Sequence, residues 1–136
     1  MIAENKLREY FTKDNFTVSC GMKIESVSSE SATVSVLLQD EHRNAAGGIH
    51  GGLIFSLADF AFGVHANSEG CLTLSQSASV SYLRGVKGEK LFATAKPVHL
   101  GKHMVTYKVE VYDDRGISVA TVTVNGFRLG ENEELK

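Results

Sequence analysis

The chain lacks the compositional features of disordered, fibrous and nucleic-acid-binding proteins. Its 136 residues include one proline and two cysteines, and its 14 basic and 16 acidic side chains leave a net charge of −2. A hydrophobic content of 43% with so little proline is typical of an ordinary globular chain and excludes a disordered or fibrous one. The near-neutral balance provides no overall basic surface, so we do not expect a nucleic-acid partner.

Long apolar runs and paired cysteines are also absent. No segment approaches the roughly 18 consecutive apolar residues of a membrane-spanning helix, and residues 1–13 lack the apolar stretch of a secretory signal. Cys20 and Cys71 stand alone, without the spacing of a zinc site or a disulfide framework. We interpret them as reduced structural thiols and expect a cytoplasmic protein without metal or membrane association.

The length and the hydrophobic periodicity predict one mixed α and β domain over residues 1–136. Helical spacing of Leu7, Tyr10 and Phe11 predicts a short amphipathic N-terminal helix. Alternating apolar residues predict strands over residues 22–27, 32–39, 72–83, 91–100, 105–112 and 117–129. Because short turns join the last four, we expect an antiparallel sheet, with a bulge or edge position at Pro97 and a frayed polar end after residue 129.

A long apolar helix is expected from about Gly52 to Asn67, and one acid lies within it. The helix is apolar around most of its circumference, so it should be enclosed by the rest of the fold. The remaining stripe is small or polar and holds Gly52, Ser56, Asp59, Gly63 and Asn67. Asp59 lies too far from the helix start to cap it. A carboxyl group in a partly apolar pocket suits a general base or acid, while the structural alternative is an ion pair with Arg43 or Arg84.

The triplet His50-Gly51-Gly52 stands where this helix begins. Backbone N–H groups are unpaired there and can form an oxyanion site, although glycines at helix starts are also common in structural turns. Gly51 and Asp59 are separated by about 12 Å along the helix, whereas groups that act on one carbonyl lie within about 3 Å of it. We therefore expect an isologous dimer in which Gly51 of one chain and Asp59 of the other share a substrate.

The central segment resembles the hotdog-fold acyl-CoA thioesterases, in particular the PaaI-like, phenylacetate-pathway branch of the 4-hydroxybenzoyl-CoA thioesterase superfamily. The motif reads Asn44-x-x-Gly47-x-x-His50-Gly51-Gly52, then Phe55-Ser56-Leu57-Ala58-Asp59-x-Ala61-Phe62 and Asn67-x-x-Gly70. The resemblance covers about residues 20–128. It implies a long central helix wrapped by a curved antiparallel sheet, dimers joined edge to edge, and a homotetramer of two dimers. It also implies hydrolysis of an acyl-CoA thioester without a cofactor, in a tunnel at the dimer interface.

The resemblance also implies roles for individual residues. Asp59 would activate water or act as a nucleophile, and the Gly51 N–H would polarise the thioester carbonyl. Asn44 and Ser77 would help to place the water or the carboxylate. His50 would orient the oxyanion loop or contact the thioester, and a purely structural role fits it equally well.

The substrate-binding residues are expected around the same helix and at the tunnel mouth. Gly52 and Ser56 share the stripe of Asp59. Arg84, Lys102 and His103 lie in or beside turns and would hold the coenzyme phosphates, although for any single one of them a solvated surface charge is the more common role.

Two other functions remain compatible with the motif. One is a non-catalytic acyl-CoA binding or sensing module. The other is a hotdog enoyl-CoA hydratase or dehydratase, in which His50 and Asp59 would act at the acyl α and β carbons. A Ser-His-Asp hydrolase is not supported, because no G-x-S-x-G elbow occurs and His65 falls opposite Asp59 on the helix, where we expect a core histidine. The sequence leaves the acyl group open.

Overall fold

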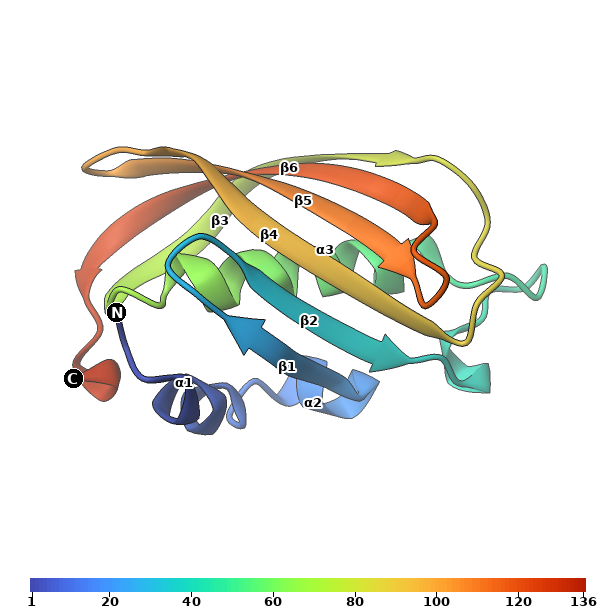
Figure 1. Cartoon of the computed structure of the whole chain (residues 1–136), viewed down its shortest axis with the longest axis horizontal. Helices are drawn as coiled ribbons and strands as arrows, with labels where there is room; N and C mark the ends of the chain where they lie inside the picture. Colours follow the sequence, from blue (N-terminus) through green and yellow to red (C-terminus); the bar gives the residue numbers. More distant parts are fainter.

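One long helix, α3 (Gly51–Ala66), lies against a curved antiparallel sheet of six strands (Figure 1). The computed structural model describes residues 1–136. The strands are β1 (Met22–Val27), β2 (Ala32–Leu37), β3 (Cys71–Tyr82), β4 (Lys90–Leu100), β5 (Met104–Asp113) and β6 (Ser118–Glu131). They are arranged in the order β1-β2-β4-β5-β6-β3, so β1 and β3 form the two edges. The expected α+β architecture with a wrapped helix is confirmed.

Helix α3 forms the centre of the hydrophobic core. Ten of its side chains are buried, including Leu57, Ala58 and Val64 at 0% exposure. They pack against the inward-facing rows of the sheet, which consist largely of small and β-branched residues. The enclosed apolar helix predicted from the sequence is therefore present, with ends one residue from the expected ones.

The N-terminal segment forms two helices where one was predicted. Helix α1 (Glu4–Phe11) is followed by α2 (Asn15–Cys20), and both lie below α3 in Figure 1. Asp14 caps α2 by accepting a hydrogen bond from the Thr17 N–H at 3.3 Å. Gly21 ends α2 in the left-handed conformation, with φ of 82°. None of the helices is long and apolar enough to cross a bilayer.

The C-terminal segment is ordered, so the predicted fraying after residue 129 is wrong. A short 3₁₀ helix, η2 (Glu133–Leu135), docks beside α1, and Leu135 is fully buried. The Asn132 N–H donates to the Gly70 carbonyl at 2.7 Å. The buried Leu135 side chain and this backbone hydrogen bond hold the polar tail against the domain.

Irregularities in the sheet determine which side chains face α3. In β3 the pairing shifts between Ser75 and Ser77, whose partners Gly126 and Asn125 are neighbours in β6. Since neighbouring strand residues point to opposite faces, the extra residue turns Ser77 away from the face that Ser75 occupies. A second shift follows Pro97 in β4, as the sequence predicted.

Candidate active site

Asp59 lines a hollow of about 200 Å³ between α3, β3 and the N-terminal helices, here called the Asp59 hollow. Helices α1 and α2 contribute side chains on one side, and β3 contributes the other. The lining residues are Tyr10, Phe11, Asp14, Thr17, Asp59, Phe60, Phe62, Gly63, Asn67, Leu72, Thr73, Leu74 and Ser75. The sequence had not predicted that the N-terminal helices reach this site.

No basic side chain within the chain forms an ion pair with Asp59. Arg43 pairs with Asp40 at 3.7 Å, and Arg84 pairs with no carboxylate. The structural alternative for Asp59 is therefore absent from the chain. Burial raises the pKa of the Asp59 carboxyl, and the negative charge of Asp14 raises it further, while the neighbouring Ser75 side chain lowers it. A partly buried carboxyl group without a cation is suited to accept and return a proton.

The start of α3 presents one free backbone donor. His50 is the N-cap, and its Nδ1 accepts a hydrogen bond from the Gly52 N–H at 2.9 Å. The Leu53 N–H donates to the His50 carbonyl at 3.0 Å. The Gly51 N–H has no partner within the chain. Of the two glycines, Gly51 thus retains a donor for an oxyanion, whereas the Gly52 N–H is already used by the cap.

Tyr82, at the end of β3, contacts the site, and the sequence alone fits it equally well to a tunnel wall and to the core. Its hydroxyl donates to the Gly51 carbonyl at 3.0 Å. A Cβ atom on Gly51 would lie 3.1 Å from the Tyr82 ring, so this position favours glycine. Nothing in the alternating pattern of β3 distinguishes Tyr82 from a core or surface residue.

Asn44 shapes the loop before α3. Its Oδ1 accepts hydrogen bonds from the N–H groups of Ala46 at 3.0 Å and Gly48 at 3.1 Å. The loop turns at Gly47, whose φ is 87°. With both bonds on Oδ1, the Asn44 Nδ2 has no partner in the chain. Asn44 therefore holds the loop through one atom and leaves the other free to contact a ligand.

Gly51 lies in a second hollow, of about 420 Å³, here called the Gly51 hollow. Arg84 is its only charged lining residue. The full lining is Asn44, Gly48, Ile49, Gly51, Ile54, Tyr82, Leu83, Arg84, Gly85 and Val86. Asp59 does not line it. Within one chain, the candidate oxyanion donor and the candidate base thus occupy separate hollows.

Two hydroxyl groups predicted at the site are bonded elsewhere. The Ser56 Oγ donates to the Gly52 carbonyl at 2.7 Å, within α3 itself. The Ser77 Oγ accepts a hydrogen bond from the Asn125 Nδ2 at 3.2 Å and is turned away from Asp59 by the bulge in β3. Ser75, not Ser77, is the serine that lines the Asp59 hollow of its own chain.

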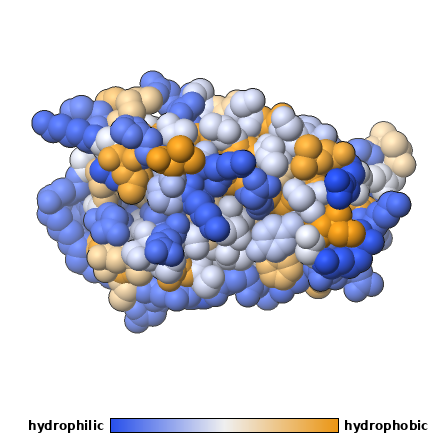
Figure 2. All heavy atoms as spheres, turned by 45° about the horizontal axis from the view of Figure 1, so that its top comes forward, coloured by the Kyte–Doolittle hydropathy of each residue, from blue (hydrophilic) through white to orange (hydrophobic).

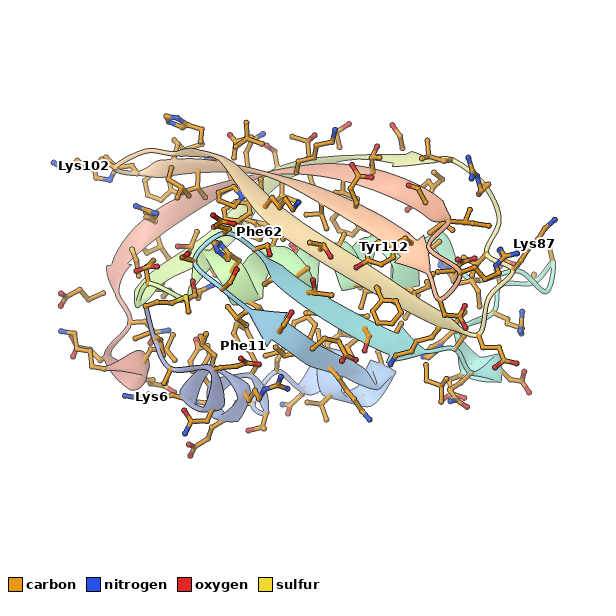
Figure 3. The ribbon with its side chains drawn as sticks, in the orientation of Figure 1. Lys6, Phe11, Phe62, Lys87, Lys102 and Tyr112 are labelled. Carbon is orange, nitrogen blue, oxygen red and sulfur yellow. The ribbon has the colours of Figure 1, made fainter.

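Lys102 and His103 lie in the turn between β4 and β5, away from the Gly51 hollow. Figure 3 shows Lys102 at the opposite end of the molecule from Lys87, which belongs to the same loop as Arg84. The His103 ring stacks on Phe127, with 6.0 Å between centroids. In a single chain, the structure therefore brings Arg84 to Gly51 but not Lys102 or His103.

His65 is a core histidine, as predicted. It is 4% exposed, and its Nδ1 lies 2.7 Å from the Tyr107 hydroxyl. Burial lowers the pKa of His65 and raises that of Tyr107 to about 12. No three His, Cys, Asp or Glu side chains come together in an arrangement that could hold a metal ion.

Comparison with known proteins identifies the family of the chain. Residues 46–120 match the model of the thioesterase superfamily. The chain is 31% identical to acyl-coenzyme A thioesterase PaaI of Escherichia coli over 121 residues, which are 88% of this chain and 86% of PaaI. It is 41% identical to a putative esterase of Archaeoglobus fulgidus over 102 residues, 74% of this chain and 66% of that relative.

Solved structures show the same fold. The structure of E. coli PaaI, from the phenylacetic acid degradation operon, superposes with a TM-score of 0.87 at 27% identity, covering 93% of this chain and 96% of PaaI. The smu.793 protein of Streptococcus mutans, bound to acetyl-CoA, superposes with a TM-score of 0.77 at 27% identity, covering 82% and 91% of the two chains. The chain therefore belongs to the thioesterase superfamily and has the hotdog fold of its PaaI-like members.

Proposed function

We propose that the protein hydrolyses acyl-CoA thioesters by attack of a water molecule that Asp59 deprotonates. The attack forms a tetrahedral oxyanion, and the Gly51 N–H hydrogen-bonds to it. When the C–S bond breaks, the coenzyme thiolate takes up the proton that Asp59 holds, and the free acid remains. The observation that carries the proposal is Asp59 itself, a half-buried carboxyl group with a raised pKa and no cationic partner.

We further propose that the active site forms between two copies of the chain. Gly51 and Asp59 line separate hollows of one chain, and about two helical turns of α3 separate them. Strand β3 is a twelve-residue edge strand with mostly exposed side chains. Unpaired edge groups favour pairing with another strand. Pairing of β3 with its symmetry mate would extend the sheet and bring the Gly51 end of one chain to the Asp59 end of the other.

A tetramer of two such dimers is the assembly that we propose for the whole protein. Exposed apolar side chains gather near the β4–β5 hairpin and the end of β6 (Figure 2). They are Val98, Leu100, Met104, Phe127 and Leu129, each at least 38% exposed. Exposed apolar surface of this kind is typical of a protein contact.

The proposed dimer also accounts for the two groups of basic residues. Arg84 lines the Gly51 hollow, whereas Lys102 and His103 lie at the other end of the molecule. In a twofold dimer these opposite ends meet. We therefore propose that coenzyme phosphates are held by Arg84 of one chain and by Lys102 and His103 of its partner.

The test of the reaction is turnover of a thioester panel by the wild type and by Asp59→Asn. Free thiol release, followed with an Ellman reagent, should appear with the wild type on at least one of acetyl-, medium-chain, long-chain and phenylacetyl-CoA. Loss of the base should lower kcat by about a hundredfold or more while binding persists. A wild-type kcat in both Asp59→Asn and Asp59→Ala would contradict the mechanism.

The same assay separates the other two functions. A hydratase would change the ultraviolet absorbance of an enoyl thioester without releasing thiol. A binding module would give neither signal while still binding acyl-CoA in a titration. The engagement of His50 Nδ1 as the helix cap disfavours the hydratase.

A further inference from the structure

Two hollows of this molecule share one aromatic wall. Beside the Asp59 hollow lies a larger one of about 530 Å³, between α1, α2 and β1, here called the α1 hollow. Phe11 and Phe60 line both hollows. Their rings meet edge to face, with 5.7 Å between centroids and 77° between planes. These two rings stand between the Asp59 hollow and the α1 hollow.

The two halves of this wall are held differently. Phe60 follows Asp59 directly in α3 and is only 6% exposed, so it belongs to the core. Phe11 is the last residue of α1 and is partly buried. Figure 3 shows it on the side of α1 that faces the sheet. Replacing Phe11 by a smaller residue should therefore disturb the core less than replacing Phe60.

The rest of α1 is attached independently of Phe11. Leu7 is fully buried, and Arg8 donates to the carbonyl of Glu25 at 3.0 Å and to that of Ile24. Helix α1 also contacts η2. A smaller side chain at position 11 should thus leave the helix in place.

The volume of the Asp59 hollow sets a limit on what can occupy it. A cavity of about 150 Å³ holds a benzene molecule. The Asp59 hollow, at about 200 Å³, therefore has room for an acyl group of about six or seven carbon atoms with a water molecule. A longer chain would have to pass Phe11. Beyond it, the α1 hollow offers apolar contacts from Val18, Met22 and Ile24.

We propose that Phe11 is the end wall of the acyl pocket and determines which acyl chain lengths this enzyme accepts. The proposal rests on the proposed thioesterase function, in which the acyl group lies beside Asp59. With phenylalanine at position 11, short and aryl acyl groups fit and long chains are excluded. With a small residue there, the two hollows join and a long chain can extend under α1.

The test compares dodecanoyl-CoA with butyryl-CoA as substrates. In the wild type, kcat/KM should be lower for dodecanoyl-CoA. Phe11→Ala should raise the ratio of dodecanoyl to butyryl kcat/KM by about tenfold or more. A single methylene group of the acyl chain that gains a place in an apolar pocket already changes relative kcat/KM by about tenfold or more. Phe11→Leu should raise it less. Phe16→Ala is the matched control, because Phe16 is 60% exposed and lines neither hollow, and it should leave the ratio unchanged.

A wild-type ratio in Phe11→Ala and Phe11→Leu, each folded by thermal melting, would overturn the proposal. So would wild-type enzyme that cleaves dodecanoyl-CoA as well as butyryl-CoA. If Phe11→Ala does not fold, the ratio in Phe11→Leu decides.

A binding measurement tests the role of Phe11 separately from the proposed hydrolysis. Non-hydrolysable butyryl and dodecanoyl thioethers of CoA are titrated into Asp59→Asn, with and without Phe11→Ala. The second change should tighten dodecanoyl binding at least tenfold relative to butyryl binding, whether or not the wild type hydrolyses any thioester. Unchanged relative affinity would refute the wall, whereas this selectivity without wild-type turnover would refute only the proposed reaction.

Discussion

Two carboxyl groups, Asp59 and Asp14, line the same hollow. Asp59 is carried by the central helix and Asp14 caps α2, so residues far apart in the sequence meet at the proposed base. The charge of Asp14 disfavours ionisation of Asp59 and adds to the effect of burial. Asp14 is thus positioned to adjust the proton affinity of the base without contacting the substrate carbonyl.

Asp14→Asn should shift the pH profile of the enzyme. Removing the charge of Asp14 lowers the pKa of Asp59, so the rise of kcat/KM with pH should move to lower pH than in the wild type. Asparagine caps helices as well as aspartate does, so α2 should remain folded. Glu30→Gln makes the same charge change on an exposed hairpin residue and should leave the profile in place. An unshifted profile in a folded Asp14→Asn would contradict this role.

The raised pKa of Asp59 also has a consequence for stability. A carboxyl group with a higher pKa in the folded state binds protons more tightly there than in the unfolded chain. Its ionisation therefore costs stability as pH rises from the pKa of the unfolded chain through the higher pKa of the folded state, and the loss is complete above the latter. Asparagine at this position does not titrate.

Asp59→Asn should consequently be more stable than the wild type at pH 7, by a few degrees in Tm at about 2–8 °C per kcal/mol. The difference should shrink as pH falls toward the usual range of aspartate, because the wild-type carboxyl becomes neutral. Thermal melts of both proteins across this pH range give the measurement. A constant difference, or a less stable variant at pH 7, would argue against burial as the cause of the shift.

At the scale of elements, Gly51 has two roles at the start of α3, and two substitutions can distinguish them. Its N–H is the proposed oxyanion donor, and its missing side chain makes room for Tyr82. Proline at this first helical position removes the N–H, and the helix start accepts its ring. His50 already has the extended backbone, with ψ of 131°, that a following proline requires.

Gly51→Pro should therefore lower kcat by about a hundredfold to a thousandfold, the usual effect of losing one oxyanion donor. Gly51→Ala is the control, since it makes a similar contact with Tyr82 but keeps the N–H, and it should retain most of the activity. Steady-state turnover of the same thioester by both variants decides the point. Equal losses would assign Gly51 a steric role only.

The elements differ in how far the sequence could predict them. Helix α3 was predictable because it is apolar around most of its circumference and has glycines at its start. Helix α2 was missed because its apolar side chains Phe16 and Val18 are 60% and 54% exposed, so no buried periodic face marks it. Asp14 before it and Gly21 after it were the only local signals.

The site residues also differ in how far the sequence could predict them. Asp59, Gly51 and Arg84 stand out by residue type and position, and the structure places each in a hollow. Ser75 could not be distinguished from Ser77, because strict alternation puts both on one face and only the bulge separates them. Phe11 and Asp14 reach Asp59 through tertiary packing of the N-terminal helices, which local periodicity does not encode.

At the scale of the whole molecule, the fold determines where catalytic groups can meet. The curved sheet holds α3 rigidly, so Gly51 and Asp59 stay about 12 Å apart in one chain. The sheet also ends in the long open edge of β3. A twofold pairing at this edge would complete two active sites at once, each with one half from each chain.

The most direct measurement of this claim combines two inactive chains. Asp59→Asn and Gly51→Pro are each expected to be nearly inactive as homodimers, but a heterodimer of the two would have one site in which both residues are intact. In an equal mixture half of the dimers are mixed, each with one intact site of two, so about a quarter of wild-type activity should return. The two variants, differently tagged, are co-expressed and their thiol release from a good acyl-CoA substrate is measured. Recovery near this level supports a shared site. If the purified mixed dimer is no more active than either variant alone, the site lies within one chain and the account is contradicted.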